Sequence, residues 1–128
     1  MSMNKERFDQ LAENLLYMSE TDAPLEYFEL SLDKSKQWPP STGGHFLSLI
    51  GEGAAKHVEK LAPEKFFRDL RQGNEGSEGQ VVAIEKAMAE ELRNLAGFRV
   101  GEIEIAIFVL GQDDSGKVCG LKTLSVET

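Results

Sequence analysis

The sequence predicts an α+β protein in which helices pack on both faces of a mainly antiparallel sheet. Residues 101–110 form the most β-prone segment and are apolar on both faces over their second half. A strand of this kind must be covered on both sides, so we expect it at the centre of the sheet. Turn residues at 111–116 and an alternating segment at 117–126 complete a predicted hairpin. We expect residues 1–128 to form one domain.

The predicted central strand divides its apolar side chains between two faces, because successive residues of a strand point in opposite directions. One face is expected to hold Ile103, Ile105, Ile107 and Val109, and the other Ala106, Phe108 and Leu110. Glu102 and Glu104 lie at its open end. Each face therefore needs its own covering layer.

The first third of the chain combines one helix with two short strands. Apolar spacing of 3, 4 and 3 predicts a helix that ends near Met18, with one stripe of Phe8, Leu11, Leu15 and Met18. A polar segment reaches Pro24, and an aromatic strand is expected within residues 25–32. Residues 33–44 read as a loop and residues 45–50 as a short strand. For residues 54–61 the pattern leaves helix and loop open.

Two further helices precede the central strand. Pro63 occupies the favoured first position of a short helix that buries Phe66, Phe67 and Leu70. Ser77 and Gln80 have capping-box spacing for the next helix, and Gly97 fits its C-terminal stop. The apolar stripe of this longer helix is Val81, Ile84, Met88, Leu92 and Leu95.

Composition restricts the possible partners. The 128 residues include 14 basic and 22 acidic ones, for a net charge of -8. This charge disfavours direct binding to nucleic acid or to an anionic membrane, and it suits a basic protein partner. No apolar run reaches membrane-spanning length and no signal-peptide pattern is present, so we expect a soluble cytoplasmic protein. We also expect it to be a monomer when free.

No set of residues predicts catalysis. His45 and His57 lack metal-ligand spacing, and residues 113–116 fit a hairpin turn better than a calcium loop. Cys119, the only cysteine, excludes an intrachain disulfide and is expected to be a small buried side chain. Trp38, beside two prolines, is either an exposed anchor or a residue that pins its loop to the core. We expect a protein that is not an enzyme and binds no cofactor.

Two carboxylates occupy distinctive positions. Glu20 follows the first predicted helix, where the simplest interpretation is a solvated turn residue. The carboxylate of Thr128 lies at the end of a predicted strand. Together they could present oxygen ligands to a basic or metal-containing site on another protein.

Both ends of the chain resemble the nuclease A inhibitor family. Leu-Leu-Tyr-Met-Ser-Glu at residues 15–20, followed by Pro24 and an aromatic strand, resembles the N-terminal signature of that family. Residues 98–105 and the ending Val-Glu-Thr at 126–128 resemble its C-terminal hairpin. Weaker correspondences occur in the right order at Phe66, Phe67 and residues 81–83. The resemblance covers almost the whole chain.

The resemblance implies a compact α/β/α sandwich that inhibits a sugar-nonspecific, Mg²⁺-dependent DNA/RNA endonuclease by blocking its active site. Glu20 matches the acidic residue that enters the nuclease site, and Thr128 matches the terminal residue whose carboxylate reaches the nuclease's metal. Ser19 and Glu127 flank these positions as further candidates for contact. The protein itself would hold no metal. One departure is the loop at residues 72–79, which has no aromatic residue where family members can carry an acidic, tryptophan-containing contact.

Two other functions remain open at this point. One is a non-catalytic interaction module of the same fold that binds a different basic protein, as the departure in the loop allows. The other is a small-molecule-binding domain or an enzyme without a recognisable motif, which the lack of a catalytic set disfavours.

Overall fold

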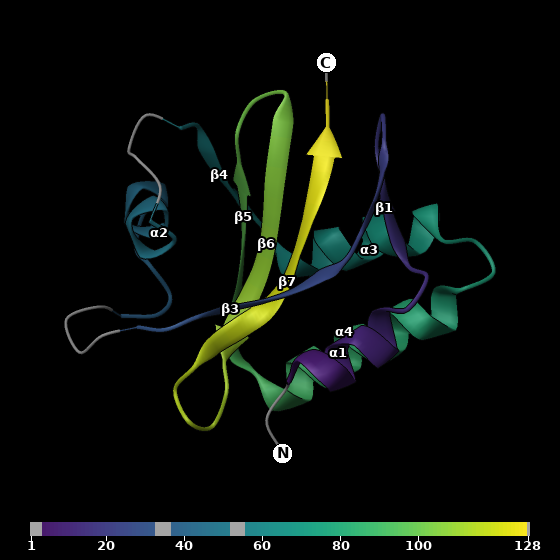
Figure 1. Ribbon diagram of the computed structural model, residues 1–128, viewed down its shortest axis with the longest axis horizontal. Helices are drawn as coiled ribbons and strands as arrows, with labels where there is room; N and C mark the ends of the chain where they lie inside the picture. Colours follow the sequence, from purple (N-terminus) through teal and green to yellow (C-terminus); the bar gives the residue numbers. More distant parts are fainter. Residues whose placement is uncertain (1–3, 33–36, 52–55, 128) are drawn as a thin grey trace.

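The computed structural model describes residues 4–32, 37–51 and 56–127. Five of its strands form one antiparallel sheet in the order β3-β7-β6-β5-β4, and β1 and β2 form a separate hairpin (Figure 1). In chain order the elements are α1 (Lys5–Ala12), β1 (Leu16–Met18), β2 (Asp22–Pro24), β3 (Glu26–Leu30), α2 (Gly43–Leu49), β4 (Val58–Leu61), α3 (Pro63–Gly73), α4 (Glu78–Glu91), β5 (Arg93–Val100), β6 (Glu104–Gln112) and β7 (Val118–Val126).

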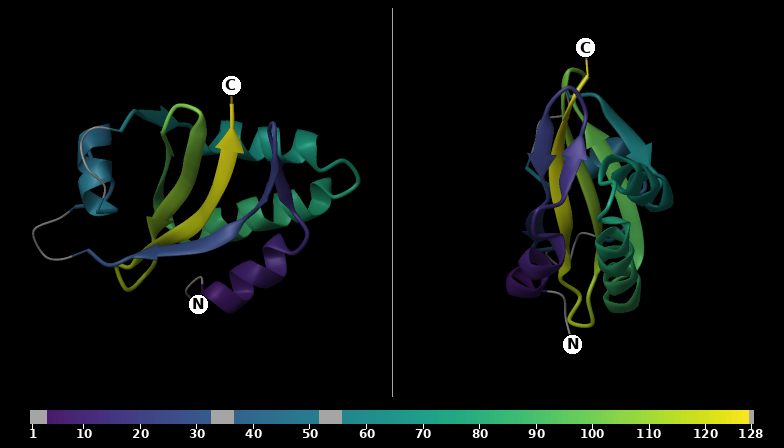
Figure 2. Two further views of the ribbon diagram at one scale, coloured as in Figure 1. Left: turned by 45° about the horizontal axis from the view of Figure 1, so that its top comes forward. Right: turned by 90° about the vertical axis from the view of Figure 1, so that its right-hand side faces the viewer.

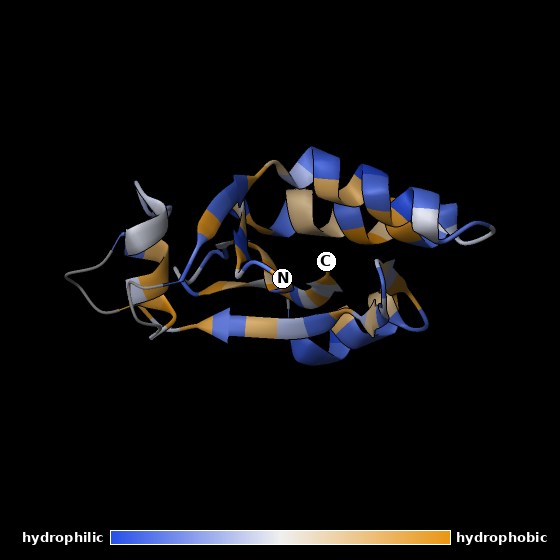
Figure 3. Cartoon of the chain, turned by 90° about the horizontal axis from the view of Figure 1, so that it is seen from above, coloured by the Kyte–Doolittle hydropathy of each residue, from blue (hydrophilic) through white to orange (hydrophobic). Residues whose placement is uncertain are grey.

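The sheet separates two apolar layers, as the predicted α+β fold requires. The larger layer packs α1, α3 and α4 against one face, and the smaller layer packs α2 and Trp38 against the other. The left view of Figure 2 shows α2 on one side of the strands and α1, α3 and α4 on the other, and Figure 3 shows the apolar sides of α3 and α4 turned toward the sheet. The prediction of helices on both faces is therefore confirmed.

The central strand is β6, paired with β5 on one side and β7 on the other. Its side chains divide as predicted, with Ile105, Ile107 and Val109 in the larger layer and Phe108 and Leu110 in the smaller. Ile103, expected on the first face, precedes the strand instead and is 59% exposed.

The predicted first helix is too long. Helix α1 ends at Ala12, and Asn14 adopts a left-handed conformation with φ 66° that an α-helix does not accommodate. Leu15 is buried from the connecting segment, whereas Met18 lies on β1 and is half exposed. The buried side chain of Asn74 holds β1, since its Oδ1 accepts from Leu16 N at 3.2 Å and its Nδ2 donates to Leu16 O at 2.8 Å.

The short strand predicted at residues 45–50 is wrong, because these residues belong to helix α2 and its cap. Thr42 begins the helix, and its hydroxyl accepts a hydrogen bond from His45 N at 3.1 Å. Phe46 on this helix stacks on Phe98 of β5 with 4.1 Å between ring centroids. The open segment at 54–61 contains β4 at Val58–Leu61, which is neither helix nor loop, and residues 52–55 lie outside the described residues.

Helix α3 begins at Pro63 and buries Phe66, Phe67 and Leu70, as predicted. The predicted end of α4 is wrong: the helix ends at Glu91, and Leu92 is already extended. Gly97, predicted as a helix stop, lies in β5. A Cβ there would stand 2.4 Å from Leu61 O, so glycine allows β4 and β5 to approach.

The predicted capping box at the start of α4 does not form. Ser77 is the N-cap residue but makes no side-chain capping bond. Gln80 instead donates from Nε2 to the carbonyl oxygens of Leu11 at 2.9 Å and Glu13 at 2.6 Å. The glutamine therefore ties α4 to the end of α1.

Trp38 pins its loop to the core. Its ring is buried against Phe98, and its Nε1 donates to Asn94 O at 2.9 Å. Cys119 is fully buried in β7, as expected for a small apolar side chain. The turn after β6 is organised by Asp113, whose Oδ1 accepts hydrogen bonds from the backbone of Ser115 and Lys117.

Two positions on α4 test the packing of the larger layer. Ile84 is fully buried, and Val82 on the same helix is 48% exposed. We expect Ile84→Ala to lower the free energy of unfolding by about 2–5 kcal/mol because it leaves a cavity. Val82→Ala should change this free energy by about 0.5 kcal/mol or less. Urea denaturation of both variants checks this, and equal midpoints would contradict the assigned helix face.

Candidate partner-binding site

Three segments that are distant in the sequence meet at one end of the molecule. They are the β1–β2 turn at residues 19–21, the β5–β6 turn at residues 101–103, and Glu127 after β7. Figure 1 shows all three beside the C-terminus, and we call this region the β7 end. Backbone hydrogen bonds join them, from Glu20 N to Val126 O at 3.2 Å and from Glu127 N to Ile103 O at 2.9 Å.

Ser19 holds the β1–β2 turn against β7. Its Oγ accepts from Val126 N at 3.0 Å and from Thr21 N at 3.4 Å, and it donates to Thr21 O at 2.9 Å. With the bond from Glu20 N, both backbone polar groups of Val126 are bound to the hairpin. The hydroxyl of Ser19 thus works inside the chain and fixes the position of the neighbouring Glu20.

Glu20 is exposed on this turn. It contributes to a shallow surface cleft between the hairpin and the end of β7, lined by Tyr17, Met18, Ser19, Glu20, Ser125, Val126 and Glu127. A carboxylate in this place can meet a large partner without rearrangement of the backbone that carries it, because that backbone is bonded to Val126.

Glu127 is held by an ion pair with β5. Its Oε2 accepts from Arg99 Nη2 at 2.6 Å and from Ser125 Oγ at 2.7 Å. These two hydrogen bonds hold the pKa of the Glu127 carboxyl below its ordinary value, so the group is negative at neutral pH. Glu127 also borders a second shallow hollow, next to Glu102 and His57.

The structure brings Glu127 beside Ser19 and Glu20, although more than a hundred positions separate it from them in the sequence. Thr128, the fourth predicted site residue, lies outside the described residues. Sequence reasoning missed Arg99, which fixes the side chain of Glu127. The sequence shows Arg99 only as a basic residue inside a β-prone segment. Its contact with Glu127 follows from the register of β5 in the sheet.

Within the predicted loop at residues 72–79, only residues 74–77 connect α3 to α4, and this connection contacts the foot of β1. The contact is made by Asn74, whose side chain binds the backbone of Leu16. This loop therefore supports the hairpin that carries Glu20.

Within residues 4–32, 37–51 and 56–127, no three or more histidine, cysteine, aspartate or glutamate residues form a group that could hold a metal ion. Across the same described part of the chain, no helix is both long and apolar enough to cross a membrane.

The sequence model of the nuclease A inhibitor-like protein family matches residues 3–128, so the chain belongs to this family. No curated protein matches the chain. Membership of this family supports a role in nuclease inhibition in general terms.

The bond from Ser19 to Val126 can be tested in the free protein. Ser19→Ala removes the acceptor for Val126 N. One hydrogen bond contributes about 0.5–1.5 kcal/mol, so its loss should speed hydrogen exchange of this amide by about 2- to 12-fold. Ser41→Ala, which removes an exposed hydroxyl bonded to His45, is the matched control. Hydrogen exchange of the Val126 amide, followed by NMR, checks this. Equal exchange rates in both variants would show that Ser19 does not hold Val126.

Proposed function

We propose that this protein inhibits a sugar-nonspecific, Mg²⁺-dependent DNA/RNA endonuclease, and that the β7 end covers the active site of that enzyme. Membership of the nuclease A inhibitor-like family is the observation that carries this proposal. The geometry of the β7 end supports it, because this end gathers three of the four residues that the resemblance implicates.

The charge of the β7 end suits a nuclease active site. Glu20, Glu102, Glu104 and Glu127 are exposed on its segments, and the net charge of the whole chain is -8. A nuclease binds a polyanionic backbone and must therefore offer a cationic groove. Carboxylates held in fixed positions can occupy such a groove in place of phosphates, and complementary charge also speeds association.

Glu20 and Thr128 are the two groups that we assign to the centre of the contact. Glu20 would enter the active site, and the carboxylate of Thr128 would reach the nuclease's Mg²⁺, which prefers hard oxygen ligands. The residue before Thr128 is well anchored, since Glu127 is bonded through its backbone to Ile103 and through its side chain to Arg99. Anchoring of the preceding residue lowers the entropy that the end of the chain loses on binding. The protein supplies no metal and no catalysis in this proposal.

One sequence feature favours a second candidate partner. The loop at residues 72–79 contains no aromatic residue, so a different basic protein could be the target of the same surface. Both candidates use one domain of residues 1–128 that is monomeric when free.

The first functional prediction concerns Glu20. We expect the wild-type protein to inhibit DNA cleavage by a Mg²⁺-dependent nonspecific nuclease at near-stoichiometric concentration. Glu20→Gln keeps the shape and removes the charge. Loss of one partner of a desolvated charge pair costs about 2–5 kcal/mol, so the inhibition constant should rise by about 30-fold or more.

Two controls separate position from total charge. Asp22→Asn removes an exposed carboxylate from the same hairpin, and Glu13→Gln removes one beyond α1. Both should weaken inhibition far less than Glu20→Gln does. Equal effects of all three variants would show that charge alone matters, and full inhibition by Glu20→Gln would exclude this residue from the contact.

The second functional prediction concerns the carboxylate of Thr128. Deleting Thr128 moves the terminal carboxylate back by one residue, about 3.3 Å for extended backbone, and a Mg²⁺–oxygen contact of about 2.1 Å does not survive that shift. Deletion, amidation or a short C-terminal extension should each weaken inhibition with nearly unchanged thermal unfolding. Thr128→Ala keeps the carboxylate and should inhibit normally. Assays across a range of Mg²⁺ concentrations check this, and an extended protein that inhibits like wild type would rule out contact with the metal.

A further inference from the structure

The exposed large apolar side chains of the protein gather near one end. Among the described residues these are Met18, Val82, Ile103 and Leu124, exposed by 50%, 48%, 59% and 39%. Met18 lines the cleft beside Glu20, Ile103 lies in the β5–β6 turn, and Leu124 is on the final part of β7. Only Val82, on α4, lies outside this region. Three of the four therefore adjoin the carboxylates of the β7 end.

Ile103, the most exposed of them, is presented by a rigid turn. Gly101 has φ 117°, and a Cβ at this position would stand 2.3 Å from Glu104 O, so the turn requires glycine. Gly101 N donates to His57 O at 2.8 Å, which joins the turn to the segment before β4. On the other side, Ile103 O accepts from Glu127 N at 2.9 Å. The exposure of Ile103 is thus imposed by a backbone that is bonded on both sides.

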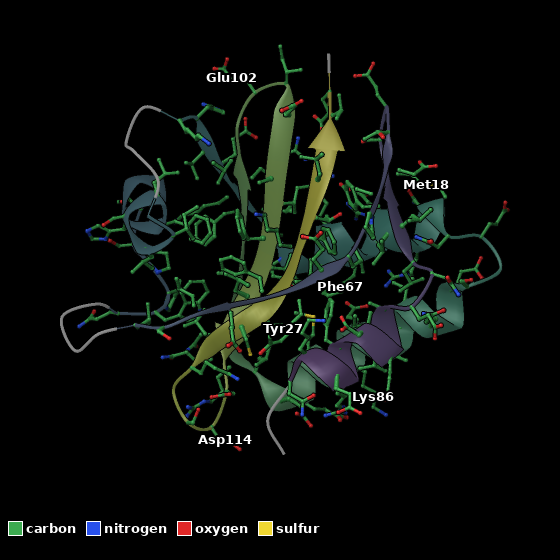
Figure 4. The ribbon with its side chains drawn as sticks, in the orientation of Figure 1. Met18, Tyr27, Phe67, Lys86, Glu102 and Asp114 are labelled. Atoms are coloured by element: carbon green, nitrogen blue, oxygen red, sulfur yellow. The ribbon has the colours of Figure 1, made fainter. Side chains whose placement is uncertain are left out.

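Acidic residues adjoin Ile103. Glu102 and Glu104 flank it in the sequence and are exposed, and the backbone N of the exposed Glu127 donates to the Ile103 carbonyl oxygen. Figure 4 shows Glu102 at the tip of the β5–β6 turn and Met18 on the opposite side of the end of β7. The complementary surface on a partner is an apolar pocket bordered by lysine or arginine. Central apolar anchors with a polar rim are the usual arrangement of the energetically important parts of protein interfaces.

We propose that Ile103 is an apolar anchor of the partner-binding surface and inserts into such a pocket beside the active site of the nuclease. The interface then extends from the Glu20 hairpin across the end of β7 to the β5–β6 turn. This inference rests on the proposed function and adds the contact that distinguishes one basic partner from another. Charge decides against a second copy of this chain as the occupant, because the same carboxylates would face each other.

The test compares two exposed β-branched residues, each replaced by serine. Ile103→Ser removes the anchor, and Val82→Ser makes the same kind of change on α4. Both side chains are exposed, so both variants should unfold at nearly the wild-type temperature. We expect Ile103→Ser to raise the inhibition constant by about tenfold or more, as truncation of an interface anchor does. Val82→Ser should stay within about twofold of wild type, and Ile103→Leu should retain most of the affinity.

The outcomes separate this inference from the proposed function. Titration of the wild-type protein into the nuclease tests the proposed function. If the wild-type protein does not inhibit, the proposed function and the role of Ile103 are both overturned. If wild type inhibits and Ile103→Ser inhibits equally well, the anchor is overturned and the proposed function stands. Sedimentation of the free proteins completes the test, since a wild-type dimer that Ile103→Ser dissociates would assign this side chain to self-association and overturn the inference.

Discussion

The pairing of β6 with β7 is the interaction on which the rest of the structure depends. It extends over nine residues of each strand, from the pair Glu104 and Val126 to the pair Gln112 and Val118. Because β6 and β7 contribute to both apolar layers, the helices on either side are positioned by this one hairpin. The same pairing brings the end of β7 beside the β5–β6 turn. The register of β6 and β7 therefore positions both the core side chains and the candidate site.

The outer edge of β7 explains why the β1–β2 hairpin lies where it does. Strand β3 pairs with β7 only from Val118 to Lys122, so the outer edge of the last residues of β7 is not covered by β3. The hairpin covers that remainder, with Thr123 Oγ1 bonded to Pro24 O and Val126 bonded to Ser19 and Glu20. An uncovered edge would invite pairing with another chain. The hydrogen bonds that protect the edge thus also fix the segment that carries the proposed contact carboxylate.

The sequence predicted correctly those elements for which a single local pattern was sufficient. Residues apolar on both faces identified β6, and Pro63 with its following aromatic residues identified α3. The segment at 45–50 was misread, because a short apolar run fits a strand or a buried helix equally well. Leu92 and Leu95 continue the helical spacing of α4 by coincidence, whereas pairing of β5 with β6 makes that segment extended.

The candidate site was less predictable, because its geometry depends on contacts between distant segments. Family resemblance pointed to Glu20 and the end of the chain, but it implied no role for Arg99 or Ile103. Ser19 and Glu127 were expected to contact a partner, and both use side-chain atoms to fix the site from within. Assigning these roles requires the register of four strands, which local sequence patterns do not provide.

The placement of α1 has a practical consequence. This helix begins at Lys5, at the end of the molecule opposite the β7 end (Figure 1). A tether attached ahead of α1 would therefore orient the carboxylates and Ile103 away from a solid support or a fused reporter. The protein therefore suits affinity capture when it is immobilised through a tether ahead of α1. A captured partner would then bind at the β7 end, away from the support.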